Sequence, residues 1–335
     1  MRHTRILETE KAIAFVKESF EKNLSSRLNL IKVSSPLAVM ENTGLNDDLN
    51  GVEVPVSFEL GWLNGQRAVI VHSLAKWKRM RLKELEMKPG TGIWTDMRAL
   101  RPGESYSPLH SIYVDQWDWE QSMKPQDRNL AFLKNTVKEL YAGLKATEKA
   151  ICNRYPDIHP ILPESIYFIH AEMLLRRYPE LTPRQREANI TRIHGAVFII
   201  GIGSKLSNGE MHDGRAPDYD DWSSANDDGF FGLNGDIVFW NPILGDAIEI
   251  SSMGIRVDAK TLRKQLLINE CKEKAELPFH QMLLNDELPQ SIGGGIGQSR
   301  VCMFMLRKKH IGEVQVSIWP ENEKALLREQ GIFLL

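Results

Sequence analysis

Strand-like segments follow one another along this chain with few helices between them, and this pattern limits the folds available to it. Four such segments, bounded by Gly, Pro and Asn, are residues 52–58, 68–72, 92–99 and 111–119. Three later ones are residues 196–202, 236–240 and 247–250. Parallel strands need a long crossover between them, whereas antiparallel strands do not. The sequence therefore predicts an α+β fold with an antiparallel β-sheet, beginning as a meander and flanked by helices.

Amphipathic helices are predicted around these strands. In the first of them, apolar residues recur at four-residue steps, at Ala12, Val16, Phe20, Leu24 and Leu28. The predicted helices are residues 8–29, 127–155, 183–194 and 301–306, and a short strand is expected at 30–33. Neither an internal repeat nor a Pro/Ser-rich linker divides the 335 residues. We therefore expect a single domain over residues 1–335.

The charge balance argues against nucleic acid as the main partner. The chain has 42 Lys and Arg against 44 Asp and Glu, for a formal net charge of −2. Cys152, Cys271 and Cys302 lie far apart without metal-binding spacing, which predicts reduced thiols. Apolar runs such as residues 196–200 are too short to cross a bilayer. We expect a soluble, cytoplasmic protein with no nucleic-acid or membrane partner.

The segment 293–300, Gly-Gly-Gly-Ile-Gly-Gln-Ser-Arg, places a bare backbone directly before a fixed positive charge. Only glycine lets a backbone approach a ligand so closely. If residues 301–306 form a helix, the glycine-rich turn offers free N–H groups at its N-terminus, and Arg300 lies within its first turn. Both suit a phosphate or a carboxylate. An ordinary hairpin or loop has similar glycines, so the segment alone leaves both interpretations open.

Two further segments place polar residues where a substrate could reach them. Residues 72–79 carry two lysines and an arginine beside Ser73, which fits either a solvated helix face or an anion site. In the strand 113–120, alternation places Gln116 and Asp118 on one surface and the aromatic residues on the other. That surface is either a solvated sheet face or a site that binds an amino group through its amide and carboxylate oxygens.

Two acidic segments are candidates for metal or nucleotide binding. Residues 215–222 pack three carboxylates beside Arg215, but their spacing matches no calcium loop, so a solvated acidic loop is favoured. Residues 249–256 combine Glu249 with two hydroxyl groups, a common environment for Mg²⁺ and nucleotides. Helix caps and salt bridges would explain each of these residues separately.

Taken in chain order, the elements resemble the three signature motifs of class II aminoacyl-tRNA synthetases. The first is an amphipathic helix leading to a strand that ends at Pro36. The second is a strand followed by Arg101, a loop with Glu104, and a returning strand. The third is a glycine-rich strand that ends in Arg300 and enters a helix. The resemblance implies the antiparallel sheet and flanking helices of that class.

A narrower resemblance points to aspartate as the substrate. Ser73 and Lys78 fit the S-P-x-x-x-K spacing of the aspartate-binding loop of aspartyl-tRNA synthetases, and residues 249–256 are similar to their E-x-G-G-G-S-x-R segment. Essentially the whole chain resembles the ammonia-dependent (A-type) asparagine synthetases. The blocks that carry this resemblance are residues 72–79, 107–120, 215–222, 249–257 and 289–300.

The resemblance implies that the chain joins aspartate and ammonia with ATP through a β-aspartyl-adenylate, giving asparagine, AMP and pyrophosphate. Arg101 would stabilise the α-phosphate and Arg300 would hold the γ-phosphate, while Mg²⁺ would bind Glu249 and Asp236. The implied ATP-binding residues are Arg101, Glu104, Arg215, Glu249, Gly293, Gly295, Gly297 and Arg300. The implied aspartate-binding residues are Ser73, Lys78, Gln116, Asp118, Asp220 and Ser252.

The ammonia step needs a proton acceptor, because only neutral ammonia can attack the adenylate. Asp47 stands at the acidic position of the resembled family and is the candidate acceptor, alongside the catalytic arginines Arg101 and Arg300. The family often has Asn after this acid, whereas Asp48 stands here. Which of the two carboxylates faces the substrate is therefore open.

Two other classes of function are weighed against this one. A tRNA-charging enzyme is disfavoured because the motifs reach almost from Met1 to Leu335, which leaves no room for an anticodon-binding domain. A non-catalytic binding module has no need for both Arg101 and Arg300. Use of glutamine is not expected, since we find no glutaminase domain and no N-terminal catalytic Cys. The resemblance also implies a homodimer joined through the first helix and the strand before Pro36.

Overall fold

The computed structural model describes residues 2–47, 49 and 53–335; Asp48 lies outside the described residues. In this part of the chain the helices are α1 (Arg2–Arg27), α2 (Ala75–Glu84), α3 (Leu130–Arg154), α4 (Ala171–Arg177), α5 (Pro183–His194), α6 (Ala259–Ile268), α7 (Pro278–Leu284), α8 (Gln298–Met305) and α9 (Glu321–Glu329). The strands are β1 (Leu30–Lys32), β2 (Ala38–Met40), β3 (Ser57–Leu60), β4 (Gln66–Ile70), β5 (Gly92–Leu100), β6 (Tyr113–Ser122), β7 (Tyr167–His170), β8 (Ala196–Ile200), β9 (Asn234–Asn241), β10 (Asp246–Ile255) and β11 (Ser291–Gly297).

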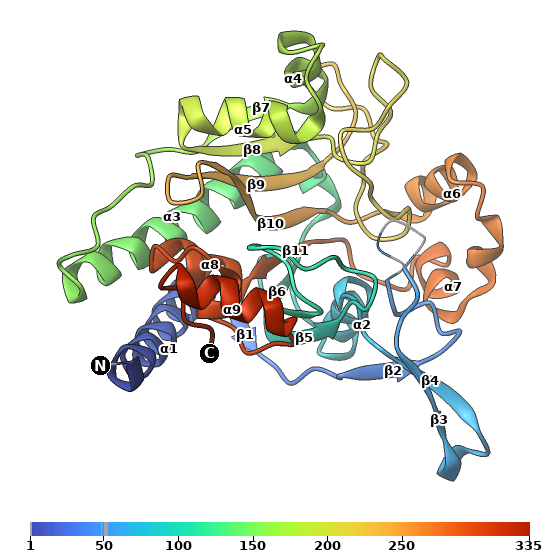
Figure 1. Ribbon diagram of the computed structural model, residues 1–335. Coiled ribbons are helices and arrows are strands. Elements are labelled where there is room, and N and C mark those ends of the chain that lie inside the picture. Colours follow the sequence, from blue (N-terminus) through green and yellow to red (C-terminus); the bar gives the residue numbers. More distant parts are fainter. Residues whose placement is uncertain (1, 48, 50–52) are drawn as a thin grey trace.

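The main sheet is antiparallel at its centre, which confirms the predicted fold class (Figure 1). Its strand order is β1-β5-β6-β11-β10-β9-β8-β7. The outermost pairs, β1 with β5 and β7 with β8, are parallel. Helices α4 and α5 connect β7 to β8 and supply the long crossover that a parallel pair requires. No helix in the described part of the chain is both long and apolar enough to cross a membrane.

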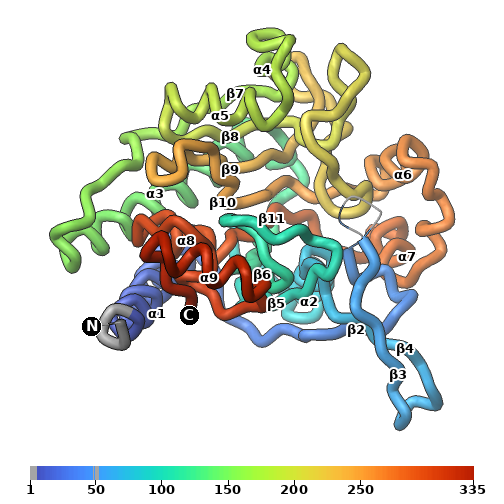
Figure 2. The backbone as a smooth tube through the Cα atoms, in the orientation of Figure 1, coloured from blue at the N-terminus to red at the C-terminus, as the bar shows by residue number. Residues whose placement is uncertain are grey.

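The predicted meander is wrong in one respect, because its first two strands leave the main sheet. β3 and β4 join β2 in a separate sheet of order β2-β4-β3, whose hairpin projects from the body (Figures 1 and 2). The strand expected at 52–58 begins only at Ser57, and residue 52 lies outside the described residues. β3 has no buried residue, and in β4 only Ala68 and Val69 are buried. These strands carry too little apolar surface for the middle of a covered sheet.

Local sequence signals explain the longest helices. The four-residue periodicity of α1 buries Val16 and Phe20 completely and leaves Leu24 only 2 % exposed. At the start of α5, Thr182 accepts a hydrogen bond from the backbone N–H of Gln185, whose side chain returns to the N-cap. This helix ends at Gly195, where φ is +73°.

One face of the main sheet packs against α1, α3 and α8. Trp117 and Trp119 of β6 are fully buried in this core, and the rings of Phe20 and Trp117 lie 4.6 Å apart. An aromatic pair of this kind contributes about 0.5–1.5 kcal/mol beyond its area burial. The opposite face carries Gln116 and Asp118, so the alternation predicted for residues 113–120 is confirmed.

The polar face is covered at its two ends and left accessible between them. Helix α2 packs on β5, β6 and β11, whereas α5 packs on β8, β9 and β10. Helices α6 and α7 lie side by side next to the loops of this face, away from α1 and both termini (Figures 1 and 2). The strands between α2 and α5 therefore form the floor of a cavity.

Candidate active site

A cavity opens on this polar face, and residues from distant parts of the sequence meet in it. Strands β6, β10 and β11 form its floor; the loop after β5, the start of α2, residues 213–220 and the start of α8 form its walls. The predicted site residues that line it are Asp47, Ser73, Arg101, Glu104, Gln116, Asp118, Arg215, Asp220, Glu249, Ser252, Gly295, Gly297 and Arg300. Lys78, Asp236 and Gly293 lie behind the lining.

Two arginines line the cavity from different elements. Arg101 follows β5, and its Nη2 donates to the carbonyl oxygen of His72 at 3.3 Å. Arg300 lies in the first turn of α8, where its Nη1 donates to the carbonyl oxygen of Glu249 at 3.2 Å and lies 3.7 Å from Oε2 of that residue. The cavity thus has a guanidinium at two separate points, as an elongated anion requires.

The glycines of β11 leave room for side chains of the neighbouring strand. Gly295 pairs with Asp118 on one side and Ser252 on the other. A Cβ at position 295 would collide with the amide oxygen of Gln116. Glycine at this position therefore lets Gln116 lie over the strand within the cavity.

One of the N–H groups predicted to be free at the start of α8, that of Ser299, is occupied. Oδ1 of Asp115 accepts hydrogen bonds from the backbone N–H of Ser299 at 3.0 Å and from its hydroxyl at 2.6 Å. Lys17 of α1 lies 3.3 Å from the other oxygen of Asp115. The carboxylate thus occupies the N–H of Ser299 at the helix N-terminus, next to Arg300.

Lys78 differs from its expected place against a substrate carboxylate. Its side chain is fully buried, and its ammonium group donates to the Asp118 carboxylate and to the carbonyl oxygens of Trp119 and Gly294. Burial lowers the pKa of Lys78, and the Asp118 and Glu120 carboxylates oppose this effect. Because its three donors are used behind the cavity wall, Lys78 positions Asp118 and does not reach into the cavity.

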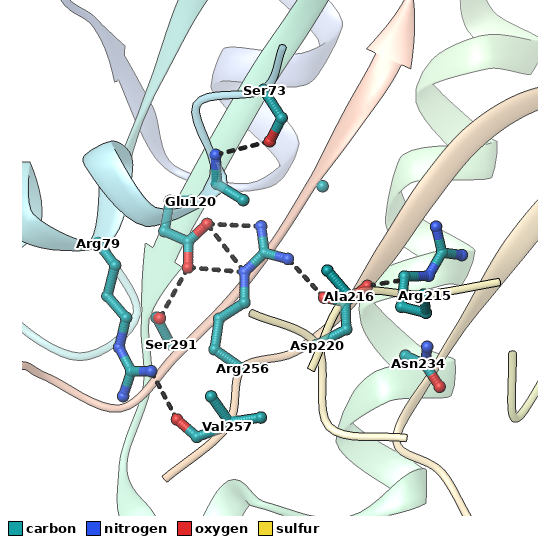
Figure 3. Close-up of polar contacts among 12 residues, drawn as sticks. Ser73, Arg79, Glu120, Arg215, Ala216, Asp220, Asn234, Arg256, Val257 and Ser291 are labelled. Atoms are coloured by element: carbon teal, nitrogen blue, oxygen red, sulfur yellow. Dashed lines mark hydrogen bonds and ion pairs between the residues drawn. The ribbon is translucent and has the colours of Figure 1, made fainter. Parts of the chain in front are cut away.

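Asp118 and Ser73 are both tied to the start of α2. The second carboxylate oxygen of Asp118 accepts a hydrogen bond from the N–H of Leu74 at 3.2 Å. The hydroxyl of Ser73 accepts one from the N–H of Ala75 at 3.1 Å (Figure 3). Strand β6 and helix α2 are therefore joined at the point where both contribute side chains to the cavity.

A buried arginine, Arg256, reaches the cavity from the end of β10 and was missed as a site residue. Its guanidinium pairs with Glu120 at 2.8–3.1 Å and with Oδ1 of Asp220 at 2.5 Å (Figure 3). Burial works against its charge, yet the two carboxylates raise the pKa of Arg256. The sequence signal was the final Arg of residues 249–256, but its partners come from strand β6 and from the loop that carries Asp220, both distant in the sequence.

Gly293 also differs from its predicted role as an ATP contact. A Cβ at this position would collide with the carboxylate of Glu120, which occupies the space above the strand. Oε1 of Glu120 also accepts a hydrogen bond from the hydroxyl of Ser291 at 2.7 Å (Figure 3). The Glu120 carboxylate, which pairs with Arg256, therefore requires glycine at this position.

A second buried ion pair joins Arg215 to the carboxylates around it. Its Nη2 lies 2.5 Å from Oδ1 of Asp236, and its Nε lies 3.7 Å from Oδ2 of Asp220. Burial raises the pKa of Asp236; Arg215 opposes this shift and the nearby Glu249 carboxylate adds to it. Residues 215–222 are thus a buried wall of the cavity, and the expectation of a solvated acidic loop is wrong.

A β-bulge in β10 turns Glu249 toward the cavity. Strict alternation would place Glu249 and Ser252 on opposite faces, because they are three residues apart. The register of β10 against β9 shifts between Glu249 and Ser251, and both Glu249 and Ser252 line the cavity. Among the described residues, no group of three or more His, Cys, Asp or Glu is arranged to hold a metal ion. A cation here would need further ligands from a substrate or water.

Asp47 lies at the edge of the cavity with only 3 % of its surface exposed. Its Oδ1 accepts a hydrogen bond from the N–H of Leu49 at 2.9 Å. Burial raises the pKa of Asp47 to about 6, although the Lys76 ammonium group lowers it. This carboxyl group therefore changes its charge near neutral pH, as a general base needs.

Solved structures with the same fold define the class to which this architecture belongs. Asparaginyl-tRNA synthetase from Pyrococcus horikoshii, complexed with asparaginyl-adenylate, is 14 % identical and superposes with a TM-score of 0.67 over 93 % of this chain and 70 % of its own. Asparaginyl-tRNA synthetase from Entamoeba histolytica, also with asparaginyl-adenylate, gives a TM-score of 0.66 at 14 % identity. That superposition covers 93 % of this chain and 66 % of the other. The fold is that of the class II aminoacyl-tRNA synthetases.

Sequence comparison is more specific. The aspartate-ammonia ligase family matches residues 7–331. The aspartate–ammonia ligase of Parabacteroides distasonis is 54 % identical over 328 residues, which are 98 % of this chain and 95 % of that protein. The aspartate–ammonia ligase of Fusobacterium nucleatum is 52 % identical over 330 residues, 98 % of each. The chain belongs to the aspartate-ammonia ligase family and is an enzyme of that type.

Proposed function

We propose that this enzyme makes L-asparagine from L-aspartate, ammonia and ATP through a β-aspartyl-adenylate, and releases AMP and pyrophosphate. The names of its relatives support aspartate and ammonia as substrates. The adenylate route rests on one observation, that Arg101 and Arg300 line the same cavity above a glycine floor. Two solved structures of the same fold hold an aminoacyl-adenylate, which also supports this route.

In the first half-reaction, an oxygen of the aspartate β-carboxylate bonds to the α-phosphorus of ATP while the bond from this phosphorus to pyrophosphate breaks. Negative charge spreads over the phosphate oxygens in the transition state, so a fixed guanidinium beside them lowers the barrier. We assign Arg101 to the α-phosphate and Arg300 to the γ-phosphate. Glu104, Arg215, Gly295 and Gly297 would complete the nucleotide site, since they line the same cavity.

The floor of the cavity has the charges needed to hold aspartate. Arg256 supplies a buried guanidinium for the α-carboxylate, a group that guanidinium binds well. Oδ2 of Asp220 is buried and accepts no hydrogen bond among the described residues, so it is available to the substrate ammonium group. The remaining polar groups that would orient aspartate are Ser73, Gln116, Asp118 and Ser252.

We propose that Mg²⁺ enters with ATP and binds Glu249, with Asp236 as a second carboxylate. The donor chemistry fits this ion, because Glu249 offers a carboxylate to the cavity, and Asp236 adds a second one behind the lining, where it pairs with Arg215. A magnesium ion of this kind takes most of its ligands from phosphate and water. When bound, it would neutralise charge on the phosphates.

In the second half-reaction, ammonium first gives a proton to a carboxylate, which we assign to Asp47. The lone pair of the resulting ammonia bonds to the β-carbonyl carbon of the adenylate. The bond from this carbon to the phosphate oxygen breaks, and AMP leaves with the electron pair. The nitrogen then gives its extra proton to solvent water, which leaves the neutral amide.

A product assay tests the proposed reaction. The purified enzyme with aspartate, ATP, Mg²⁺ and ammonium is expected to release AMP and asparagine in equal amounts. Without ammonium, aspartate-dependent exchange of pyrophosphate into ATP is expected to continue, because the adenylate can form and reverse. Release of ADP would rule out the adenylate, and transfer of aspartate to tRNA would favour a tRNA-charging enzyme.

Asp47→Asn is expected to slow asparagine formation by about a hundred- to ten-thousandfold and to leave pyrophosphate exchange unchanged, because only the second half-reaction uses this carboxylate. In the unmodified enzyme, asparagine formation at constant ammonia concentration should fall as the pH drops through 6, where Asp47 becomes protonated. Rates measured from pH 5 to 8 test this. Asp48→Asn is the comparison variant; if it alone abolishes the ammonia step, the assignment to Asp47 is wrong.

We also propose that the enzyme is a homodimer joined along β1. This strand forms one edge of the main sheet; Ile31 within it is 55 % exposed, and Leu37, five residues after its end, is 58 % exposed. Exposed apolar residues at a sheet edge favour pairing with another chain. Sedimentation at micromolar concentration is expected to give a species of twice 38.2 kDa, and a monomer would contradict the proposal.

A further inference from the structure

We propose that His280, on helix α7 and outside the cavity lining, is a positioning residue that holds the Asp47 loop in place for the ammonia step alone. This inference rests on the proposed function, in which Asp47 accepts a proton from ammonium. In this proposal, the side chains at the start of α7 hold the loop from one side.

The loop that leads to Asp47 passes directly over the ring of His280. At Gly44 the backbone has φ +77°, and a Cβ there would lie 2.7 Å from Nδ1 of His280 and 3.1 Å from Cβ of Leu277. The N–H of Phe279 donates to the carbonyl oxygen of Thr43 at 3.1 Å. The loop is therefore seated on the start of α7 by one hydrogen bond and by a contact that only glycine permits.

The ring of His280 is itself fixed by a buried ionic cluster. Its Nε2 lies 2.9 Å from Oδ2 of Asp218, and Nζ of Lys76 lies 2.8 Å from the same oxygen. The side chains of all three residues are at most 3 % exposed. Burial opposes the charge of Asp218, yet Lys76 and His280 keep its pKa well below the ordinary value. Asp218 therefore stays ionised, and His280 cannot turn away without leaving this buried carboxylate with one partner fewer.

On its other side the loop is tied to the end of β4. Oδ1 of Asn46 accepts a hydrogen bond from the N–H of His72 at 2.8 Å, and Nδ1 of His72 lies 3.1 Å from the carbonyl oxygen of Asp47. Asp47 is thus held between β4 and α7. Loss of the α7 contact frees one side of the loop and leaves the other attached.

Four groups face the Asp47 carboxyl group from the elements around it. Lys76 comes from α2 and Arg101 from the loop after β5, and both lower its pKa; Asp218 raises it. Tyr219, whose own pKa is raised by burial and by Asp47, lies on the same side as Asp218. Burial is the largest cause of the raised pKa of Asp47, so a loop that leaves its seat and gains water should lose most of this shift.

His280 contacts the Asp47 loop and Asp218, whereas Arg101, Arg300 and the glycines assigned to ATP lie on other elements. Arg215 and Asp220 share the loop of Asp218 and are held there by their own ion pairs with Asp236 and Arg256. Replacement of His280 should therefore slow the second half-reaction and spare the first. Adenylate formation should persist, but the adenylate should meet ammonia without a placed proton acceptor. Water would then hydrolyse part of it, so AMP would be released without asparagine.

The test compares His280→Ala and Gly44→Ala with the unmodified enzyme. Each variant is expected to slow asparagine formation by about ten- to a hundredfold and to keep aspartate-dependent pyrophosphate exchange within about twofold, since a misplacement near 1 Å has effects of this size on one step. The pH at which the rate of asparagine formation falls on the acid side should move from about 6 toward 3.8, the ordinary pKa of Asp. His280→Gln, which can still donate to Asp218, should recover part of the lost rate.

A matched pair elsewhere in the chain provides the control. His170 of β7 lies under Gly201, where φ is +84° and a Cβ would collide with the ring, and both residues lie away from the cavity. His170→Gln and Gly201→Ala should lower both half-reactions equally or neither. Equal loss of both half-reactions in the His280 and Gly44 variants, or an unchanged pH for the fall in rate on the acid side, would overturn the inference. Absence of exchange in the unmodified enzyme would instead overturn the proposed function.

Discussion

Arg101→Ala is expected to slow aspartate-dependent pyrophosphate exchange by about a hundred- to a thousandfold, the loss found when one preorganised donor to a developing negative charge is removed. The substrate complex should be weakened less than the transition state, because charge on the α-phosphate oxygens grows as the new bond forms. We therefore expect kcat to fall more than KM for ATP rises. Steady-state exchange rates over a range of ATP concentrations measure this division.

The fold should tolerate this change because Arg101 has few internal contacts. Its side chain makes one hydrogen bond, to the carbonyl oxygen of His72, and its Nε has no hydrogen-bond partner among the described residues. The backbone N–H of Arg101, which donates to the carbonyl oxygen of Ile112, is retained in the variant. Arg98→Ala is the matched control, since Arg98 lies on the same strand with its side chain exposed. Full exchange activity in Arg101→Ala, or an equal loss in Arg98→Ala, would refute the assigned role.

Local periodicity was enough to predict the parts of the fold that depend on neighbouring residues. Alternation in β6 placed Gln116 on one face and Trp117 on the other, and the four-residue steps of α1 identified its buried side. The separate sheet of β2, β3 and β4 was not predictable in this way. Strand pairing depends on which apolar faces meet in three dimensions, and the short strands β3 and β4 bury little.

The candidate site divides in the same manner. Arg101 and Arg300 were identified because motif spacing fixes their positions in the chain, and both line the cavity. The spacing of residues in the sequence could not predict how deeply each side chain is buried. Lys78 has the expected interval from Ser73 but is buried between α2 and the sheet, paired with Asp118. Arg256 was not identified, because its place in the site depends on ion pairs with residues of β6 and of the 213–222 loop.

We therefore expect the proposed aspartate pocket to depend on the buried pair of Arg256 and Glu120. Glu120 is fully buried, and burial would raise its pKa; the Arg256 guanidinium reverses this and lowers the pKa of Glu120 below its ordinary value. The carboxylate thus contributes stability that is present above the ordinary Glu pKa and is lost as the pH falls through its lowered value. Asp220 is the other carboxylate bound to Arg256, so loss of Glu120 would draw this guanidinium toward Asp220 and away from the place assigned to the α-carboxylate.

Glu120→Ala is expected to lower the free energy of unfolding by about 3–5 kcal/mol, because it leaves Arg256 buried with one of its two carboxylate partners missing. Aspartate KM should rise together with this loss, whereas ATP KM should change little. Denaturant unfolding and initial-rate kinetics measure the two effects. Glu139→Ala breaks the partly exposed pair with Arg27 at 3.2 Å and should change stability by less than about 1 kcal/mol. If Glu120→Ala were as stable as Glu139→Ala, Arg256 would not need its buried partner, and the pocket would have to be held by Asp220 alone.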